Sequence, residues 1–343
     1  MSIVAGLDIH RRQITFDALD RVAGEVSRGR IASTPAAVGA WVERFGGREL
    51  EAALEACAGW LFVVEALLEA GATPQLAEPA ETSALRGKKR RAKTDRADAR
   101  HLRELLAEGR LPEAWIAPAQ VREWRTRTRL RLRLLEERGQ WLHRIRATLF
   151  HHGVPAAALP ADLCNRQGRE ALASLVLPPA SRERIEVALC LLEAIDRQLG
   201  TLERELRRLA RKQPGCQALM RHYGIGPLTA PTILCELGDV RRLSASREAV
   251  RAVGLDIGVH RSDRRSRPGK LTRQGPPEAR WALYEAAQSA TRRTSPDHAH
   301  YLELKAGGLS HKQASLTIAR RLTRRCFHTL RELGPQALEP VGD

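Results

Sequence analysis

Apolar and polar residues alternate in short stretches through the first third of the chain, a pattern typical of strands joined to amphipathic helices. The expected elements are a strand at 3–9, a strand at 12–19, a strand at 24–31, an amphipathic stretch at 34–45, a strand at 50–56, a helix at 60–70 and a strand at 74–78. Three strands before the first helix predict an antiparallel meander with the later strands added beside it.

That strand order is the order of an RNase H-like sheet, in which acidic residues at strand ends and on one helix meet at a metal site. Other α/β folds share the order, so the order alone does not decide the fold. The interpretation of residues 1–112 as an RNase H-like α/β domain therefore depends on where its acidic residues lie.

The pattern from Pro118 onward is helical. One apolar stripe keeps helical spacing through Leu130, Leu134, Trp141, Ile145 and Leu149. Arg125, Arg129 and Arg133 lie along a neighbouring face of the same helix. A charged helical face is usually only solvated, but so many arginines with few acids nearby favour a helix that contacts a nucleic-acid backbone.

The segment from Ser181 to Lys212 has the clearest periodicity in the chain. Its apolar residues alternate spacings of three and four, and they are Ile185, Ala188, Leu192, Ile195, Leu199, Leu202, Leu206 and Leu209. This heptad seam predicts packing against another helix. The partner is either the helix at 118–150, folding back as an antiparallel pair, or the same helix in another subunit.

A further boundary at Pro214-Gly215 begins the last domain. Gly224 and Gly226 flank Ile225 in a turn that we expect between two short helices, which resembles a helix-hairpin-helix element. The backbone amides of such a turn can hold a nucleic-acid phosphate. The alternative is a tight turn that needs two glycines for purely conformational reasons. The expected domains are thus 1–112, an α/β domain, 113–213, a helical coiled-coil region, and 214–343, a mainly helical domain.

A basic, irregular stretch runs from Gly254 to Gly275, and helices are expected after it at 277–293, 297–306 and 311–333. Ser262 and Ser266 lie in this stretch among several arginines. A serine hydroxyl in such a phosphate-binding setting can be a nucleophile. Taken in isolation, the stretch is better explained as a binding loop, since no His-Asp pair can be assigned to either serine from spacing.

The overall charge narrows the class of partner. The chain has 343 residues, a formal net charge of +17 and a pI near 10.6. Because the charge is spread over several elements, a polyanion such as nucleic acid is the expected partner. No apolar run approaches the length needed to span a bilayer, so a membrane is not expected. The six cysteines show no metal-ligand spacing, the N-terminus lacks the features of a secretion signal, and a cytoplasmic location is expected.

Four carboxylates are the candidate chemistry of the first domain. Asp8 ends the first strand, Glu55 lies in a later strand, and Asp95 and Asp98 begin a helix for which Thr94 is a plausible N-cap. Residues three apart share one helical face, and carboxylate oxygens suit Mg²⁺ or Mn²⁺. Basic neighbours that would attract phosphate crowd the same stretch, namely Arg86, Lys88, Lys89, Arg90, Arg91, Lys93, Arg96 and Arg100. An exposed cluster of salt bridges is the alternative.

Several motifs, in their order and separation, resemble one family. They are Gly6-Leu7-Asp8-Ile9-His10, Glu55, Lys93-Thr94-Asp95-Arg96-Ala97-Asp98-Ala99, Gly224-Ile225-Gly226-Pro227 and the stretch from Ser262 to Gly275. The chain resembles, over essentially its whole length, the DEDD transposases of the insertion-sequence one-ten family, which are also described as bridge-RNA-guided recombinases and are related to the Piv invertases. The Thr-Asp-Arg-x-Asp-Ala block and the serine loop are the most specific parts.

The resemblance implies a RuvC-like N-terminal domain, a coiled-coil insertion and a C-terminal domain with an essential serine. Asp8, Glu55, Asp95 and Asp98 fall on the family's metal-binding tetrad, and Ser262 falls on its serine. The implied mechanism is attack of that serine on a DNA phosphodiester with Mg²⁺, or Mn²⁺, at the carboxylates, in a dimer or tetramer whose composite active site draws on different subunits. The family commonly has a small residue after the serine where this chain has Asp263, so Ser266 is the alternative nucleophile.

The implied partners are donor DNA, target DNA and a structured guide RNA. The residues expected to contact nucleic acid are Lys88, Lys89, Arg90, Arg91, Arg125, Arg129, Arg133, Gly224, Gly226, Arg261, Arg264, Arg265, Lys270 and Arg273. Two other classes of function fit parts of the sequence. One is a RuvC-like junction nuclease that cuts without a covalent intermediate, and the other is an inert nucleic-acid-binding scaffold.

Overall fold

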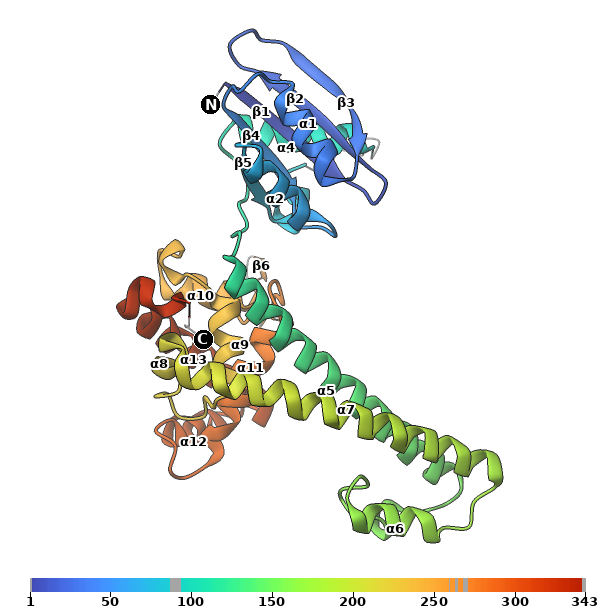
Figure 1. Cartoon of the computed structure of the whole chain (residues 1–343). Coiled ribbons are helices and arrows are strands. Elements are labelled where there is room, and N and C mark those ends of the chain that lie inside the picture. Colours follow the sequence, from blue (N-terminus) through green and yellow to red (C-terminus); the bar gives the residue numbers. More distant parts are fainter. Residues whose placement is uncertain (1, 87–93, 259, 263–264, 268–270, 341–343) are drawn as a thin grey trace. The chain divides into compact units, whose positions relative to one another are not determined.

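The computed structural model describes residues 2–86, 94–258, 260–262, 265–267 and 271–340. Contacts divide the chain into two compact units, residues 1–116 and 117–343 (Figure 1). The first is a mixed α/β unit and the second is mainly helical. The finer division at 112 and 213 stays a prediction.

The first unit is built on a five-stranded sheet. Its strands are β1 (Ile3–Ile9), β2 (Gln13–Asp20), β3 (Val26–Ala32), β4 (Leu50–Glu55) and β5 (Thr73–Ala77). They lie in the order β3-β2-β1-β4-β5, with β1, β2 and β3 antiparallel and with β4 and β5 parallel to β1. The predicted meander with later strands added beside it is confirmed.

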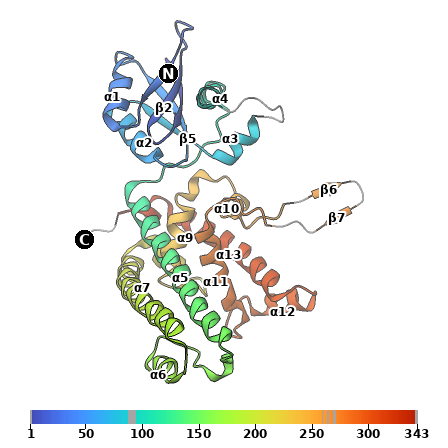
Figure 2. The same ribbon diagram turned by 90° about the vertical axis from the view of Figure 1, so that its right-hand side faces the viewer.

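Helices cover both faces of this sheet. Helices α1 (Pro35–Glu43) and α2 (Trp60–Glu69) pack on one face, where Leu7, Trp41 and Val64 belong to the larger core. Helix α4 (Asp95–Ala107) packs on the other face, where Val4 and Leu102 are buried together. Figure 2 shows α1 and α2 on one side of the strands and α4 on the other. A short helix, α3 (Pro79–Leu85), leads from β5 toward α4.

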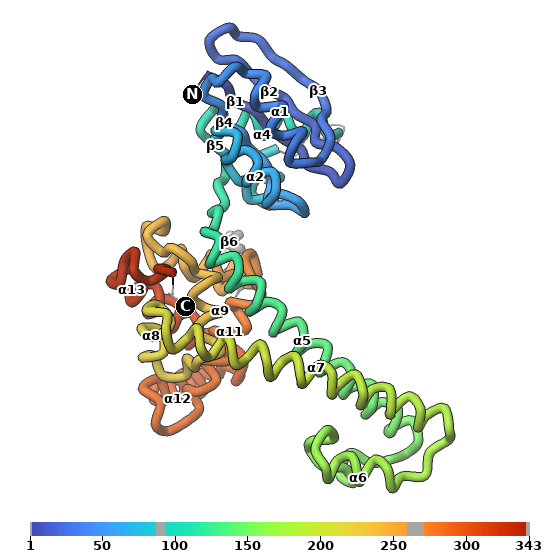
Figure 3. The backbone as a smooth tube through the Cα atoms, viewed as in Figure 1, coloured from blue at the N-terminus to red at the C-terminus, as the bar shows by residue number. Residues whose placement is uncertain are grey.

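Two long helices dominate the start of the second unit. Helix α5 (Ala119–His151) and helix α7 (Pro179–Lys212) lie side by side, and α6 (Arg166–Ser174) belongs to the connection between them (Figure 3). Arg131 pairs with Glu203 at 2.8 Å, and Arg138, further along α5, pairs with Asp196, further back on α7, at 2.6 Å. The two helices are therefore antiparallel. The apolar seam of α7 packs against α5 of the same chain.

Most of the predicted seam is buried. Six of its residues are buried, namely Ile185, Ala188, Leu192, Leu199, Leu202 and Leu206, and Ile195 and Leu209 are half-buried. The stripe predicted on α5 was wrong at Leu130, which is 50% exposed. The buried face passes through Thr128 and Arg131 instead, because Glu203 supplies an acid that satisfies the guanidinium of Arg131.

The remaining helices form a bundle. They are α8 (Pro214–Leu219), α9 (Thr229–Leu237), α10 (Ser246–Ala252), α11 (Pro277–Gln288), α12 (His298–Ala306) and α13 (His311–Leu333). Helix α9 is buried from Ala230 to Leu237 because α5, α8 and α11 all pack against it. The strands β6 (His260–Ser262) and β7 (Arg265–Arg267) pair as an antiparallel hairpin between α10 and α11. Among the described helices, none combines the length and apolar character needed to cross a membrane.

Candidate metal centre and nucleic-acid contacts

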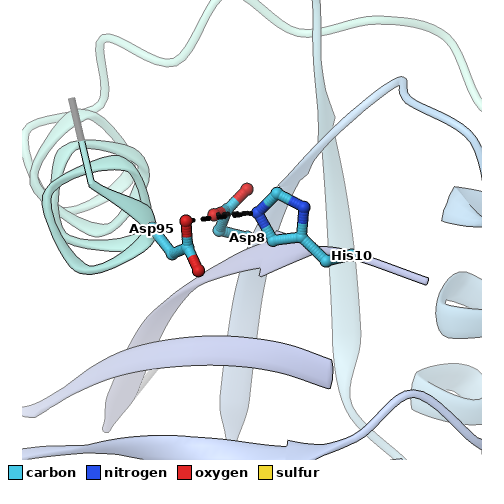
Figure 4. Close-up of side chains that lie close together, drawn as sticks. All are labelled: Asp8, His10 and Asp95. Atoms are coloured by element: carbon cyan, nitrogen blue, oxygen red, sulfur yellow. Dashed lines mark hydrogen bonds and ion pairs between the residues drawn. The ribbon is translucent and has the colours of Figure 1, made fainter. Parts of the chain in front are cut away.

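Asp8 lies near the end of β1, and His10 is the first residue after that strand. The two residues are two positions apart, a spacing that sends side chains of an extended chain to the same side. The His10 Nε2 atom is 3.0 Å from Asp8 Oδ2 and 3.4 Å from Asp95 Oδ1 (Figure 4). Three ligand atoms, one from each residue, lie within 4.8 Å of one another. His10 was not predicted as a site residue, although its spacing from Asp8 was a signal that could have identified it.

The N-terminus of α4 brings the two other aspartates to this place. Thr94 is the N-cap, as predicted, and its hydroxyl oxygen accepts a hydrogen bond from the Ala97 amide at 3.3 Å. Asp95 and Asp98 occupy the first helical turn, where the positive end of the helix dipole favours carboxylates. Asp95 lies beside His10, whereas Asp98 accepts a hydrogen bond from Arg86, so the expected shared direction of the two aspartates toward one ion stays a prediction.

Two features hold α4 close to the sheet. Gly6 lies on the same face of β1 as Asp8, and a Cβ on Gly6 would be 2.0 Å from the carbonyl oxygen of Ala99. Arg103 of α4 donates to the buried Asp17 of β2 at 2.5 Å, and Arg28 donates to the other oxygen of that carboxylate at 2.7 Å. The buried pair and the close backbone contact therefore fix α4 over β1 and β2.

Arg86 joins the remaining carboxylates. Its Nη2 atom is 3.9 Å from Glu55 Oε1, and its Nη1 atom donates to Asp98 Oδ1. Glu55 ends β4, which runs parallel to β1 with Leu54 beside Leu7, so Glu55 and Asp8 reach the same edge of the sheet. The four predicted residues thus form two groups, Asp8 with Asp95 around His10 and Glu55 with Asp98 around Arg86.

An open cavity of about 700 Å³ connects these groups. Asp8, Glu55 and Asp98 line it together with His10, and Phe62 belongs to its apolar wall. The cavity is therefore acidic on the side of β1, β4 and α4, and apolar on the side of α2.

The pKa of Asp8 reflects its burial and the other carboxylates near it. Burial raises the pKa of Asp8, and the nearby charges of Asp98 and Asp95 raise it further, although His10 acts in the opposite direction. Carboxylates that share a site repel one another unless a cation lies among them. The carboxylate oxygens of the site are hard ligands that fit a divalent cation. The Arg86 guanidinium and the His10 imidazole lie between these carboxylates.

The arginines of α5 divide into two kinds. Arg129 makes a bidentate contact with Glu236 of α9 at 2.7 and 2.9 Å, and Glu236 is only 6% exposed. Arg125 donates to the Cys235 carbonyl oxygen at 2.8 Å and lies 3.7 Å from Glu236. Arg133 is 70% exposed and pairs with Glu136. Arg125 and Arg129 therefore join α5 to α9, and phosphate contacts by all three stay a prediction.

The two glycines of the turn before α9 also have internal partners. Gly224 has a φ of 91°, and a Cβ there would be 2.3 Å from the Ala286 carbonyl oxygen. The Gly226 amide donates to the Thr229 hydroxyl at 2.9 Å. The turn thus has a conformational reason for glycine at 224, whereas a Cβ on Gly226 would meet nothing within 4 Å. Contact of the turn with phosphate stays a prediction.

The serine loop begins and ends at two close backbone approaches. A Cβ on Gly254 would be 2.4 Å from the Gln274 carbonyl oxygen, and one on Gly275 would be 2.2 Å from that of Ala252. Between them, Ser262 is the last residue of β6 and pairs in register with Arg265 of β7. Arg273, near the end of the loop, has a φ of 55°.

Several predicted contacts cannot be placed. Lys88, Lys89, Arg90, Arg91, Arg264 and Lys270 lie outside the described residues. Arg261 and Arg265 lie in the β6–β7 hairpin, where Ser266 pairs in register with Arg261.

Comparisons with known proteins agree with the resemblance in the sequence. Residues 5–152 match a model described as transposase, of the DEDD type, and residues 216–303 match a model described as transposase of the IS116/IS110/IS902 family. A probable family 20 transposase of Pseudomonas aeruginosa is 24% identical over 70% of this chain and 71% of its own length. The transposase for insertion sequence element IS1111A of Coxiella burnetii is 23% identical over 70% of this chain and 65% of its own length.

A third relative is an uncharacterized 44.8 kDa protein of insertion element IS116 from Streptomyces clavuligerus, which is 29% identical over 37% of this chain. The match spans only 32% of that relative's length. The two family models together match residues in both compact units, the one at 1–116 and the one that contains the helical bundle and the serine loop. The chain belongs to the IS116/IS110/IS902 family of DEDD transposases.

Proposed function

We propose that the chain is the transposase of an insertion sequence, with a RuvC-like nuclease domain at residues 1–112, and that it cuts and rejoins DNA strands. The observation that carries this proposal is that three carboxylates, Asp8 of β1, Glu55 of β4 and Asp98 of α4, line one open cavity. The fourth, Asp95 of α4, lies beside His10, which also lines that cavity. Ordinary surface acids would not be expected to converge from three separate elements at a site where their charges repel.

The residues that would hold a divalent cation are Asp8, Glu55, Asp95 and Asp98. Mg²⁺, or Mn²⁺, bound there would stabilise the negative charge that develops on phosphate oxygens during strand transfer. The protein side chains have their own tasks. Asp8, Glu55 and Asp98 face the cavity, and the net positive charge of the chain attracts the DNA backbone.

The covalent step that we propose uses Ser262. Its Oγ attacks the phosphorus of a DNA phosphodiester, a phosphoserine ester forms, and one DNA hydroxyl leaves with a proton. Attack by a hydroxyl of another strand then breaks the phosphoserine bond and returns the proton to Ser262. Because each step exchanges one phosphate ester for another, the strands can be rejoined without ATP.

The specificity that we propose comes from a structured guide RNA that pairs with donor and target DNA. The guide RNA is carried over from the family resemblance, and the net charge of +17 supports only the broader expectation of a polyanionic partner. The assembly that we propose is a dimer or a tetramer of the chain.

The experiment that tests this function is sequencing of DNA junctions in cells that carry the gene with its native flanking DNA. Wild type is compared with Ser262→Ala and Asp98→Asn, with Ser266→Ala as the matched control in the same hairpin. We expect seamless junctions in wild type and in the control, and none in the two other variants. Unrejoined breaks that survive Ser262→Ala would identify a junction nuclease. No DNA change in any variant would identify an inert scaffold.

A further inference from the structure

We propose that His10 is a fifth ligand of the divalent cation, and that it makes the site favour Mn²⁺ over Mg²⁺ more than four carboxylates alone would. The inference rests on the proposed function, because it concerns the same metal site. It adds a residue outside the carboxylate tetrad and a preference among metals.

The first support is the position of the imidazole. His10 Nε2 lies 3.0 Å from Asp8 Oδ2 and 3.4 Å from Asp95 Oδ1, and Figure 4 shows the ring directed at both carboxylates. Two ligand atoms that each lie about 2.1 Å from one ion, at right angles, are about 3.0 Å apart. The nitrogen is therefore as close to the two oxygens as a neighbouring ligand of the same ion would be.

The second support is how the chain delivers this side chain. His10 follows directly after β1, whose register with β2 pairs Asp8 with Thr15 and Ile9 with Ile14. Its backbone amide donates to the Gln13 carbonyl oxygen at 2.9 Å, which closes the turn between the two strands. The backbone of His10 is therefore held beside Asp8 by the sheet, and the imidazole, which is half-exposed, reaches the two carboxylates from there.

A histidine nitrogen changes the character of an oxygen site. Mg²⁺ binds carboxylate and water oxygens at short, rigid distances and gains little from imidazole. First-row transition metals accept imidazole readily, and Mn²⁺ accepts both carboxylate and imidazole. The mixed set of Asp8, His10 and Asp95 therefore suits Mn²⁺ better than a set of carboxylates would.

The competing explanation is that His10 is only a cationic partner of the two carboxylates. A charged imidazolium would occupy the position of the metal, and the metal would have to displace it. The two explanations predict opposite effects of removing His10. A ligand that is removed weakens Mn²⁺ binding, whereas a competing cation that is removed strengthens it.

The test uses the full-length chain and Mn²⁺ alone, without nucleic acid. Mn²⁺ and Mg²⁺ affinities are measured by titration calorimetry for wild type, His10→Gln and His10→Ala, and electron spin echo spectra of bound Mn²⁺ are recorded for modulation from a directly bound nitrogen. His101→Gln is the matched control, because His101 is the other histidine of residues 1–116 and its Nε2 contacts the Thr82 carbonyl oxygen. Asp98→Asn identifies the binding that belongs to this site.

We expect the nitrogen modulation in wild type and in His101→Gln, and its loss in His10→Gln. Mn²⁺ affinity should fall about tenfold or more in both His10 variants, as it does when a metal site loses a supporting group, while Mg²⁺ affinity falls less. Bound Mn²⁺ without nitrogen modulation, or stronger Mn²⁺ binding in the His10 variants, would overturn the role of His10 and leave the carboxylate site intact. If Asp98→Asn bound Mn²⁺ as well as wild type, or if wild type bound no Mn²⁺, the metal site itself would be overturned.

Discussion

Gly6 of β1 lies against the backbone of Ala99 in α4, so closely that a Cβ on Gly6 would be 2.0 Å from the Ala99 carbonyl oxygen and 2.6 Å from the Arg103 amide nitrogen. Because those atoms are backbone, no side-chain rotation can relieve the clash. Asp95 begins the same helix, and Asp8 follows Gly6 on the same face of the strand. The distance between Asp8 and the first turn of α4 therefore depends on a residue that has no side chain.

The substitution Gly6→Ala should push α4 away from the sheet. We expect a loss of about 1 to 3 kcal/mol in the free energy of unfolding, as for other overpacked cores, and weaker Mn²⁺ binding because Asp95 and Asp98 move away from Asp8. Thermal melts with and without Mn²⁺ measure both effects.

Gly39→Ala in α1 is the control for this prediction. Nothing lies within 4 Å of a Cβ at Gly39, and alanine is the better helix former by about 1 kcal/mol. The melting temperature should stay unchanged or rise. If Gly6→Ala were as well tolerated as Gly39→Ala, the close approach of α4 would not control the site.

Asp8→Asn should stabilise the metal-free protein at neutral pH. Burial raises the pKa of Asp8 above its ordinary 3.8, so stability falls as pH rises from 3.8 through the raised pKa, where the folded state still binds a proton that the unfolded state has released. An uncharged amide avoids this loss. We expect a higher melting temperature than wild type at pH 7 in EDTA, and no advantage near pH 3.

Addition of Mn²⁺ should make the melting temperature of wild type higher than that of Asp8→Asn. The melting temperature of wild type should rise on addition of Mn²⁺, because the ion binds the folded state. The melting temperature of Asp8→Asn should rise little. A lower melting temperature of Asp8→Asn in EDTA at pH 7 would mean that the contact with His10 outweighs burial.

Arg86→Met should raise the affinity for divalent cations and lower stability in their absence. The guanidinium donates to Asp98 and lies 3.9 Å from Glu55, so it supplies positive charge that a metal would otherwise supply. In EDTA, loss of this partly exposed pair should cost up to about 1 kcal/mol. Calorimetric titration with Mn²⁺ measures the affinity. Weaker binding in Arg86→Met would show that Arg86 orients the carboxylates more than it competes with the metal.

Arg129→Ala should be strongly destabilising, whereas Arg133→Ala should not. Removing Arg129 leaves the buried carboxylate of Glu236, among the described residues, with the more distant Arg125. Because the Arg129 side chain is 47% exposed, the expected loss is about 2 kcal/mol, below that of a fully buried pair. Arg133 is exposed and pairs within its own helix, so its loss should change stability by less than about 0.5 kcal/mol. Urea unfolding of both variants measures the difference, and equal effects would contradict the pairing.

The same geometry changes how a nucleic-acid role of α5 should be tested. Arg133→Ala preserves the fold, so a smaller salt dependence of DNA affinity in this variant would report a lost phosphate contact. Fluorescence anisotropy with a labelled duplex over a range of salt concentrations measures the slope. A slope equal to that of wild type would remove Arg133 from the predicted contacts. Arg125 and Arg129 are unsuitable for this test because their substitution disturbs the contact with α9.

The contacts of this unit explain why the sequence identified some residues of the site and missed others. Asp8 and Glu55 end strands, and Asp95 and Asp98 begin a helix, and such positions can be read from local periodicity. The ion pairs of Arg86 join it to carboxylates 31 positions earlier and 12 positions later, as the residue numbers show. No local pattern distinguishes Arg86 from its basic neighbours.

The sequence by itself determined the strand order, the capped start of α4 and the heptad seam of α7, and it pointed to the four carboxylates of the candidate site. These follow from backbone geometry, because a period of two or of 3.6 residues sets which side chains share a face. Only the tertiary structure decided that α7 packs on α5 of the same chain, that Arg129 pairs with Glu236, and that His10 lies between Asp8 and Asp95. Such contacts depend on how separate elements pack, and the free energy of that packing is a property of the whole core.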